Sequence, residues 1–269
     1  MKILIDCDYI VYKCCAAAET EMDFGDDVIV VTSNFSDAYK CVKRDLDRIQ
    51  SDLGSFDDEL ILFFTSPQNF RKKILPEYKG HRQRKKPCGF KRVISELKKN
   101  YRVILKDTLE ADDAIGIYAT KYPGNIIVSP DKDMRQIPGK LYDFKETVEI
   151  TPDEGARWHL IQTMAGDNTD GYSGVPGIGV KKAEKIFEEK GYTWKAVVET
   201  FVEKDMTEED ALINARLARI LTTDDYDHER KEPILWQPIP DYQIDPPSRL
   251  TNEGAVSYTH LTLPTILLV

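Results

Sequence analysis

Short apolar segments alternate with amphipathic, helix-like segments through the first 150 residues. The apolar segments are rich in β-branched residues and are bounded by polar or turn-forming residues, as expected of buried strands. They are KILID (2–6), VIVVT (28–32), LILFF (60–64), RVIL (102–105) and NIIVS (125–129). Amphipathic segments at 36–53 and 111–121 lie between them. This alternation predicts an α/β fold with a mostly parallel central sheet flanked by helices.

From Thr151 onward the chain is predicted to be helical. Thr151 is a suitable N-cap, and Pro152 is favoured at the first position of a helix. Further helices are predicted at 158–165, 181–190, 194–202 and 208–221.

The composition divides the chain into four parts. We expect an α/β domain at 1–150 with a basic segment at about 71–100, a helical domain at 151–225, and an extended Pro-rich tail at 226–254. The remaining residues, 255–269, contain VSYTHLTLPT (256–265), which resembles a translated sequencing adaptor. We therefore expect this last part to be non-native and exclude it from the fold.

Charge is distributed unevenly along the chain. The net charge of −9 at pH 7, taken alone, disfavours a nucleic-acid partner. The segment 71–106, however, holds 14 Lys and Arg residues against two acids, whereas the remainder holds 23 basic and 44 acidic residues. This polarity predicts a basic surface for phosphates beside an acidic region with another role.

Cysteine usage and hydrophobicity indicate the compartment. The five scattered cysteines form no CxxC pair, and the four histidines show no spacing typical of a zinc site. No apolar stretch approaches the roughly 18 residues of a membrane span, and the N-terminus lacks the layout of a signal peptide. We expect a cytoplasmic protein with no membrane partner.

Acidic residues recur where the predicted strands end and where the helical part begins. The carboxyl ends of parallel strands meet at one edge of a sheet, so these carboxylates are expected to lie together, where they repel one another unless cations neutralise them. Mg²⁺ prefers such oxygen ligands, and two ions about 4 Å apart promote phosphodiester hydrolysis. A lone DxD most often lies in a solvated loop, but four clusters at these positions favour a metal site. The eight carboxylates are those of Asp6, Glu110, Asp112, Asp113, Asp131, Asp133, Asp167 and Asp170.

Five motifs follow one another in an order that identifies a family. They are ILIDCDYIVYK (3–13), PEYKGHR (76–82), LEADD (109–113), SPDKD (129–133) and GDNTDGYSGVPGIGVKKAEKI (166–186). Together they resemble the 5′-nuclease superfamily of flap endonucleases, bacterial DNA polymerase I 5′-nuclease domains and tailed-phage 5′–3′ exonucleases. The resemblance covers about residues 2–190 and is most similar to the phage branch. It implies a PIN-like domain with a helix-hairpin-helix domain, and a structure-specific 5′ nuclease that leaves 5′-phosphate and 3′-hydroxyl ends on DNA.

The resemblance also implies how metals are held. Asp6, Glu110 and Asp112 match the residues of a first metal site, and Asp131, Asp133 and Asp170 match those of a second. Asp113 and Asp167 would assist directly or through water. The implied ions are two Mg²⁺, which Mn²⁺ can replace. Many relatives carry another Asp after the strand that matches LILFF, where this chain has Thr65 and Ser66, so we expect weaker metal binding.

Basic and hairpin residues are matched in the same way. Lys79 and Arg82 would reach the scissile phosphate. Asp112 would take part in catalysis as a ligand of the metals. Tyr78 would stack on an unpaired base. The glycines and lysines of the hairpin at about 172–190 would bind duplex backbone, with a K⁺ ion nearby. The expected DNA-binding residues are Arg71, Tyr78, Arg84, Lys85, Lys86, Lys91, Arg92, Gly177, Gly179, Lys181 and Lys182.

Two other readings of the acidic site stay open at this point. One is an RNA-directed nuclease with a similar site, and the other is a non-catalytic, structure-specific DNA-binding protein. For the main reading we expect a monomer that binds DNA with a 5′ end or a 5′ flap at a duplex junction, in a bacterial or phage-infected cell.

Overall fold

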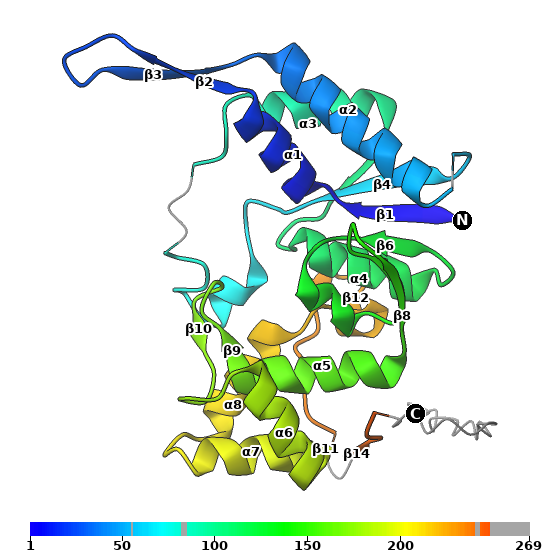
Figure 1. Ribbon diagram of the computed structural model, residues 1–269. Coiled ribbons are helices and arrows are strands. Elements are labelled where there is room, and N and C mark those ends of the chain that lie inside the picture. The colour runs from blue at the N-terminus through cyan, green and yellow to red at the C-terminus, as the bar shows by residue number, and fades with distance from the viewer. Residues whose placement is uncertain (55, 82–84, 240–242, 248–269) are drawn as a thin grey trace.

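The computed structural model describes residues 1–54, 56–81, 85–239 and 243–247 (Figure 1). A six-stranded sheet in the order β5-β4-β1-β6-β7-β8 forms the centre of the N-terminal part, and only β8 is antiparallel to its neighbour. The predicted α/β fold with a mostly parallel sheet is confirmed. The strands are β1 (Lys2–Asp6), β4 (Glu59–Phe64), β5 (Arg102–Leu105), β6 (Ile126–Val128), β7 (Gly139–Tyr142) and β8 (Thr147–Ile150).

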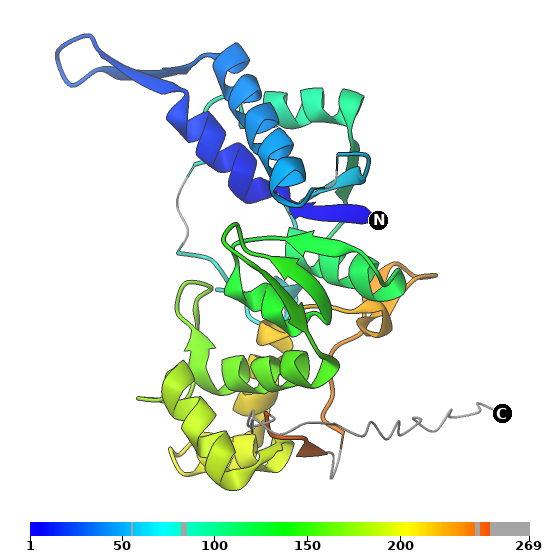
Figure 2. The ribbon, with the colours of Figure 1, turned by 45° about the vertical axis from the view of Figure 1, so that its right-hand side comes forward.

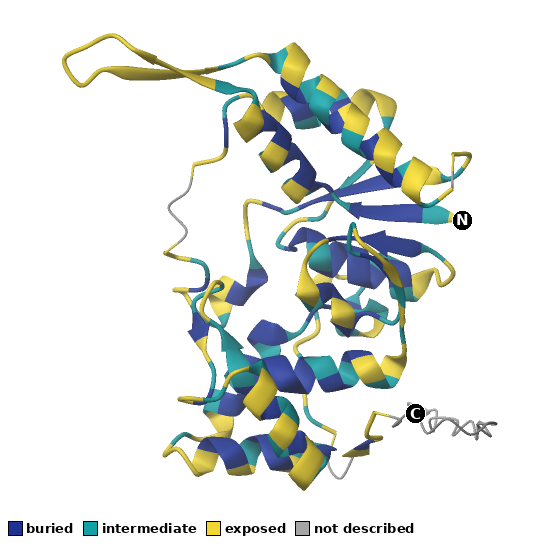
Figure 3. Cartoon of the chain, viewed as in Figure 1, coloured by how far each residue is buried: buried dark blue, intermediate teal, exposed yellow. Residues whose placement is uncertain are grey.

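Helices cover both faces of the sheet because the apolar strands alternate their side chains. Ile3 and Ile5 pack with α1 (Cys7–Ala17), α2 (Phe35–Asp52) and α3 (Phe90–Asn100) on one face. Leu4 packs on the opposite face. The helix on that face is α4 (Ala111–Lys121), which matches the segment predicted from the sequence. The buried band between these layers is visible in Figure 3.

The second part of the molecule is helical, as predicted, and it has a core of its own. Its helices are α5 (Pro152–Ala165), α6 (Val180–Lys190), α7 (Trp194–Val202) and α8 (Glu208–Ala218). At the start of α5 the Glu154 amide donates to Thr151 Oγ1 at 3.2 Å, and the Thr151 amide donates to the Glu154 carboxylate at 2.7 Å. This capping box explains why the helix begins where the sequence predicts. No helix in the described ranges is long and apolar enough to cross a membrane.

One predicted strand lies outside the central sheet. β3 (Ile29–Ser33) pairs antiparallel with β2 (Glu19–Asp23), and this hairpin projects from the body beyond α1 and α2 (Figures 1 and 2). Ile29, Val30 and Val31 are exposed, so their apolar character does not reflect burial in the sheet. The prediction that 28–32 joins the sheet was wrong, because the neighbouring polar segment β2 takes it as a partner. Strands β7 and β8 were not predicted.

Short elements connect the larger ones. They are β9 (Gly166–Asp167), β10 (Tyr172–Ser173), β11 (Tyr192–Thr193), β12 (Tyr226–Asp227), β13 (Glu232–Pro233), β14 (Gln243–Ile244) and the 3₁₀ turns η1 (Phe70–Lys73), η2 (Lys132–Gln136) and η3 (Thr223–Asp225). The described end of the tail returns to the helical part, where β14 pairs with β11. The suspected non-native residues 255–269 lie outside the described residues.

Candidate active site

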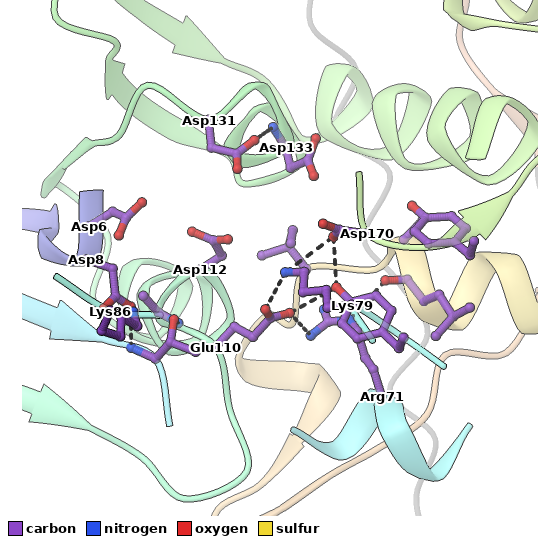
Figure 4. A pocket seen from close by; sticks show the side chains of 17 residues that line it. Asp6, Asp8, Arg71, Lys79, Lys86, Glu110, Asp112, Asp131, Asp133 and Asp170 are labelled. Carbon is purple, nitrogen blue, oxygen red and sulfur yellow. Dashed lines mark hydrogen bonds and ion pairs between the residues drawn. The ribbon is translucent and has the colours of Figure 1, made fainter. Parts of the chain in front are cut away.

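An acidic cavity of about 290 Å³ lies where the carboxyl ends of the central strands meet the helical part. Asp6 ends β1, Asp112 lies in the first turn of α4, and Asp170 comes from the turn between β9 and β10. Figure 4 shows these carboxylates around one shared space. The carboxylates that line the cavity are those of Asp6, Asp8, Glu110, Asp112, Asp131, Asp133 and Asp170.

Burial and mutual repulsion change the protonation of three of these acids. Burial, and next the charge of Asp8, raises the pKa of Asp6 to about 7. Burial and Asp131 raise the pKa of Asp133 to about 7. Burial, followed by repulsion from Asp6 and Asp131, raises the pKa of Asp112 well above its ordinary value. Without a counter-ion, keeping these carboxylates ionised therefore lowers the stability of the folded chain.

The residues present suit divalent cations. Asp112 Oδ1 is buried and has no hydrogen-bond partner among the described residues, although buried polar atoms are nearly always paired. The donors around it are carboxylate oxygens from separate elements, the type of ligand that Mg²⁺ binds. A cation in the cavity would neutralise the repulsion and satisfy the orphaned oxygen.

Glu110 differs from the other acids because three donors surround it. Lys79 Nζ contacts one carboxylate oxygen, and Arg71 Nη1 donates to the other at 3.1 Å. The Tyr78 hydroxyl oxygen also lies 3.1 Å from that second oxygen. Burial opposes ionisation, but Lys79 and then Arg71 hold the pKa of Glu110 at about 2. Lys79 also lies 3.4 Å from Asp170, so it connects the acids of the two parts of the molecule.

Three predicted roles are wrong in this structure because the side chains are buried. Arg71 is 1% exposed, and its guanidinium binds both oxygens of Asp113 at 2.7 and 2.8 Å. Asp113 is fully buried and also accepts from the Leu221 amide, so it is not placed to hold a metal. Tyr78 is 1% exposed; its hydroxyl donates to Asp170 at 2.9 Å, so its ring cannot stack on a base. These three buried side chains therefore help to hold the acidic residues of the site in place.

The sequence reasoning missed Asp8. The Thr65 amide donates to Asp8 Oδ2 at 2.7 Å, which places this carboxylate at the end of β4. Thr65 Oγ1 in turn accepts from the Ala111 amide at the start of α4. Asp8 therefore lies beside Thr65, the position at which the sequence resemblance led us to expect an Asp. Its separation of two residues from Asp6 was the signal in the sequence.

The other basic residues occupy varied positions. Lys85, Lys86, Lys91 and Arg92 are exposed, and Lys86 lies 3.4 Å from Asp8. Lys91 and Arg92 belong to α3, whose apolar side packs on the sheet, so this end of the basic segment is part of the α/β core. Arg82 and Arg84 lie outside the described residues.

The last predicted ligand, Asp167, does not line the cavity. Its Oδ1 accepts from the Thr169 amide at 2.7 Å, and its Oδ2 lies 3.6 Å from Lys132 Nζ. Asp167 therefore shapes the turn that carries Asp170, and its own side chain is not part of the cavity lining.

The hairpin residues surround the start of α6. Gly177 has φ +77°, a conformation that suits glycine, and space is open around Gly177 and Gly179. Lys181 and Lys182 are exposed in the first turn, and Lys182 Nζ donates to the Gly177 carbonyl at 2.8 Å. Free amides at a helix start, with cations beside them, are suited to a phosphate.

A second cluster of ligand atoms lies between α1 and α2, but it does not suit a metal. The Cys14, Cys41 and Asp45 ligand atoms lie within 4.8 Å of one another. Lys13 already pairs with Asp45 at 2.6 Å, and burial keeps the pKa of the Cys14 thiol raised. A protonated thiol is a poor ligand.

These pKa shifts predict how pH and Mg²⁺ change stability. The folded pKa values of Asp6 and Asp133 lie near 7, above the ordinary 3.8, so the folded chain binds more protons between these limits. Without metal, stability should fall as pH rises from about 4 to about 7, by up to about 1.4 kcal/mol per pH unit for each group. Mg²⁺ should raise the melting temperature more at about pH 7.5 than at about pH 5. Differential scanning fluorimetry measures both, and an equal Mg²⁺ shift at the two pH values would contradict this.

Known proteins are similar to this chain in sequence and in fold. A family model described as the 5′-3′ exonuclease, N-terminal resolvase-like domain, matches residues 2–156. The exodeoxyribonuclease of Enterobacteria phage T3 is 26% identical over 279 residues, covering 88% of this chain and 92% of the relative. The exonuclease of Escherichia phage T7 is 26% identical, with 88% and 93% covered.

Solved structures agree on the fold. A phage T5 protein crystallised with metal ions superposes with a TM-score of 0.61 and 16% identity, covering 81% of this chain and 89% of that one. At this identity the likeness supports the fold alone. The family model, in contrast, spans more than half of the 269 residues. The chain belongs to the 5′-3′ exonuclease family of nucleases.

Proposed function

We propose that this protein is a structure-specific DNA 5′ nuclease, acting as a 5′–3′ exonuclease or flap endonuclease. The observation that carries the proposal is the meeting of carboxylates from separate segments in one cavity, with Asp112 Oδ1 left unpaired. Two bound Mg²⁺ ions, which Mn²⁺ can replace, would supply positive charge to the attacking and leaving oxygens, so that 5′-phosphate and 3′-hydroxyl ends result. The T3 and T7 relatives are named exonucleases, and a T5 flap endonuclease has been solved with DNA and metal ions.

The residues of the cavity divide into two ligand groups. Asp6, Glu110 and Asp112, joined by Asp8, form the first group. Asp131, Asp133 and Asp170 form the second, and Asp167 supports the turn behind it. Lys79 is one of the cations that line the cavity, and it neutralises the phosphate during cleavage when it moves from Glu110. The same role for Arg82 is a prediction from the motif.

In this proposal the protein binds DNA through the charge of the phosphate backbone and does not recognise the base sequence. The amides at the start of α6, with Lys181 and Lys182, grip the duplex backbone, and a K⁺ ion binds at this hairpin. The exposed Lys85, Lys86 and Lys91 hold the 5′ strand, together with Arg92. Lys72 and Lys73 are exposed beside the buried Arg71, and they take over its predicted contact with phosphate. The protein acts as a monomer on a 5′ end or flap.

Cleavage of a 5′-labelled flap duplex tests the proposal. Mg²⁺ should support cutting near the junction, EDTA should abolish it, and the new ends should be 5′-phosphate and 3′-hydroxyl. The same duplex with an RNA flap strand serves as the comparison. Cutting of RNA alone would favour an RNA-directed nuclease, and binding without cutting would favour a DNA-binding protein.

A substitution swap tests the place of Asp8 in the first ligand group. Asp8→Asn should weaken metal binding by about ten-fold to a hundred-fold, since it removes a carboxylate held at the site. Thr65→Asp in the same variant should recover much of this loss, because it returns one negative charge to the neighbouring position. Titration calorimetry with Mn²⁺ in the absence of DNA measures the affinities.

The control for the swap is Asp45→Asn, which removes a carboxylate of α2 that pairs with Lys13 and does not line the acidic cavity. It should leave the Mn²⁺ affinity unchanged. If Asp8→Asn binds Mn²⁺ as tightly as the original chain, Asp8 has no part in holding metal.

A further inference from the structure

A second cavity, of about 390 Å³, lies between α4 and the segment that contains β5. Arg102 and Ile104 line it from β5, where alternate residues share a face, and Lys106 lines it just after the strand ends. β5 is the edge strand of the sheet. Tyr118 and Lys121 line it from the last turn of α4, and Tyr122 lines it from the residue that follows the helix. This cavity shares no lining residue with the acidic cavity, so the two are separate sites.

The lining of this cavity is cationic. Four of its residues are Lys or Arg, and none is Asp or Glu. Lys2 and Arg102 each lie 3.7 Å from Glu59 at the rim. Among the described residues, no acid lies within 4.0 Å of the amino groups of Lys106 and Lys121. Two lysines therefore face the cavity without an ionic partner.

The pKa values of two groups at this cavity are lowered, as expected where positive charges lie close together without acids. Burial and then Lys121 lower the pKa of Lys106. Burial, followed by Lys121 and Lys106, also lowers the pKa of His228, which lines the same cavity. An anion between these groups would relieve their repulsion, and a phosphate oxygen accepts from ammonium groups.

Aromatic side chains lie beside the lysines. The rings of Tyr118 and Tyr122 have centroids 4.9 Å apart, and Tyr122 is 49% exposed. Lys121 Nζ lies 5.9 Å from the centroid of the Tyr122 ring. This arrangement is suited to a nucleotide. The base can stack on the exposed ring, and the phosphate can be neutralised by the lysines that lack an ionic partner.

We propose that this cavity binds one nucleotide unit, with its phosphate at Lys106 and Lys121 and its base against Tyr122. The unit belongs either to a free nucleoside monophosphate or to a single strand of DNA, which share this chemistry. The inference does not rest on the proposed function, since binding here needs neither a metal nor cleavage.

Titration calorimetry in EDTA with thymidine 5′-monophosphate, a short thymidine oligonucleotide and inorganic phosphate tests the proposal. EDTA leaves the acidic cavity without metal, and its carboxylates then repel phosphates. The combined Lys106→Gln and Lys121→Gln variant should bind the nucleotide ligands at least ten-fold more weakly than the original chain. The Tyr122→Ala variant should bind them about five-fold or more weakly, with little change for inorganic phosphate.

The matched control is the combined Lys140→Gln and Lys145→Gln variant, which removes the same charge from exposed positions elsewhere. It should bind as the original chain does. Sensitivity of the monophosphate to the cavity variants supports a free-nucleotide site, and sensitivity of the oligonucleotide alone supports a strand site. The proposal is overturned if neither ligand responds, or if the control variant loses as much affinity as the cavity variant.

Discussion

Asp112→Asn is expected to lower the rate of flap cleavage about a thousand-fold while DNA binding is kept. The substitution preserves the shape of the side chain but removes the charge of the carboxylate whose Oδ1 is unpaired in the cavity. Loss of one ligand from a metal site that stabilises developing charge costs several kcal/mol in the barrier, and about 4 kcal/mol corresponds to this factor. Single-turnover cleavage with labelled flap DNA measures the rate, and fluorescence anisotropy in Ca²⁺ measures the binding.

The same variant should be more stable than the original chain when metal is absent. Burial and repulsion from Asp6 and Asp131 disfavour the charged form of Asp112, and asparagine removes that cost. Asp47→Asn, on the exposed side of α2, is the control and should change neither property. Unaltered cleavage by the Asp112 variant would mean that this acid does not hold a catalytic metal.

Arg71→Met is expected to lower the free energy of unfolding by about 3–5 kcal/mol. The guanidinium is 1% exposed, binds both Asp113 and Glu110, and donates to the carbonyls of Leu217 and Arg219. Its removal leaves the buried carboxylate of Asp113 without its ionic partner and takes one of three donors from Glu110, which costs far more than the pair itself contributes. Urea unfolding followed by circular dichroism gives the difference.

Lys72→Met is the matched control for this prediction. It removes the same charge from the next residue, which is exposed, and should change stability by less than about 0.5 kcal/mol. A loss below about 1 kcal/mol for Arg71→Met would show that Asp113 and Glu110 find other partners. The expected contrast also separates the structural role of Arg71 from the DNA contact first predicted for it.

Periodicity predicted those elements whose apolar pattern reflects burial in the core. β1 and α4 were predicted at their observed bounds because their apolar residues face the sheet or its covering layers. The hairpin β2–β3 carries an apolar run on the surface, so pattern alone assigned it to the sheet. The strands β7 and β8 are short and half polar, and pairing at the sheet edge makes them strands.

For the site, the sequence indicated which acids gather but not which of them face the cavity. Asp112 and Asp113 are neighbours in one motif, yet the turn of α4 directs one into the cavity and the other to Arg71. Residues 71 and 78 lie in a basic, surface-like segment, and only their long-range partners explain their burial. Such partners are separated by many residues, so local pattern cannot reveal them.

The position of β1 in the sheet has a consequence for biosynthesis. β1 is synthesised before the other strands of the sheet, but it lies at the middle of the sheet between β4 and β6. Its second neighbour, at Ile126–Val128, is made more than a hundred residues later, which takes roughly 6 to 25 seconds at ordinary elongation rates. During this interval Ile3, Leu4 and Ile5 have only part of their final surroundings. The central sheet therefore cannot be completed in the order in which its strands are synthesised, and β1 keeps an unpaired edge until β6 has emerged.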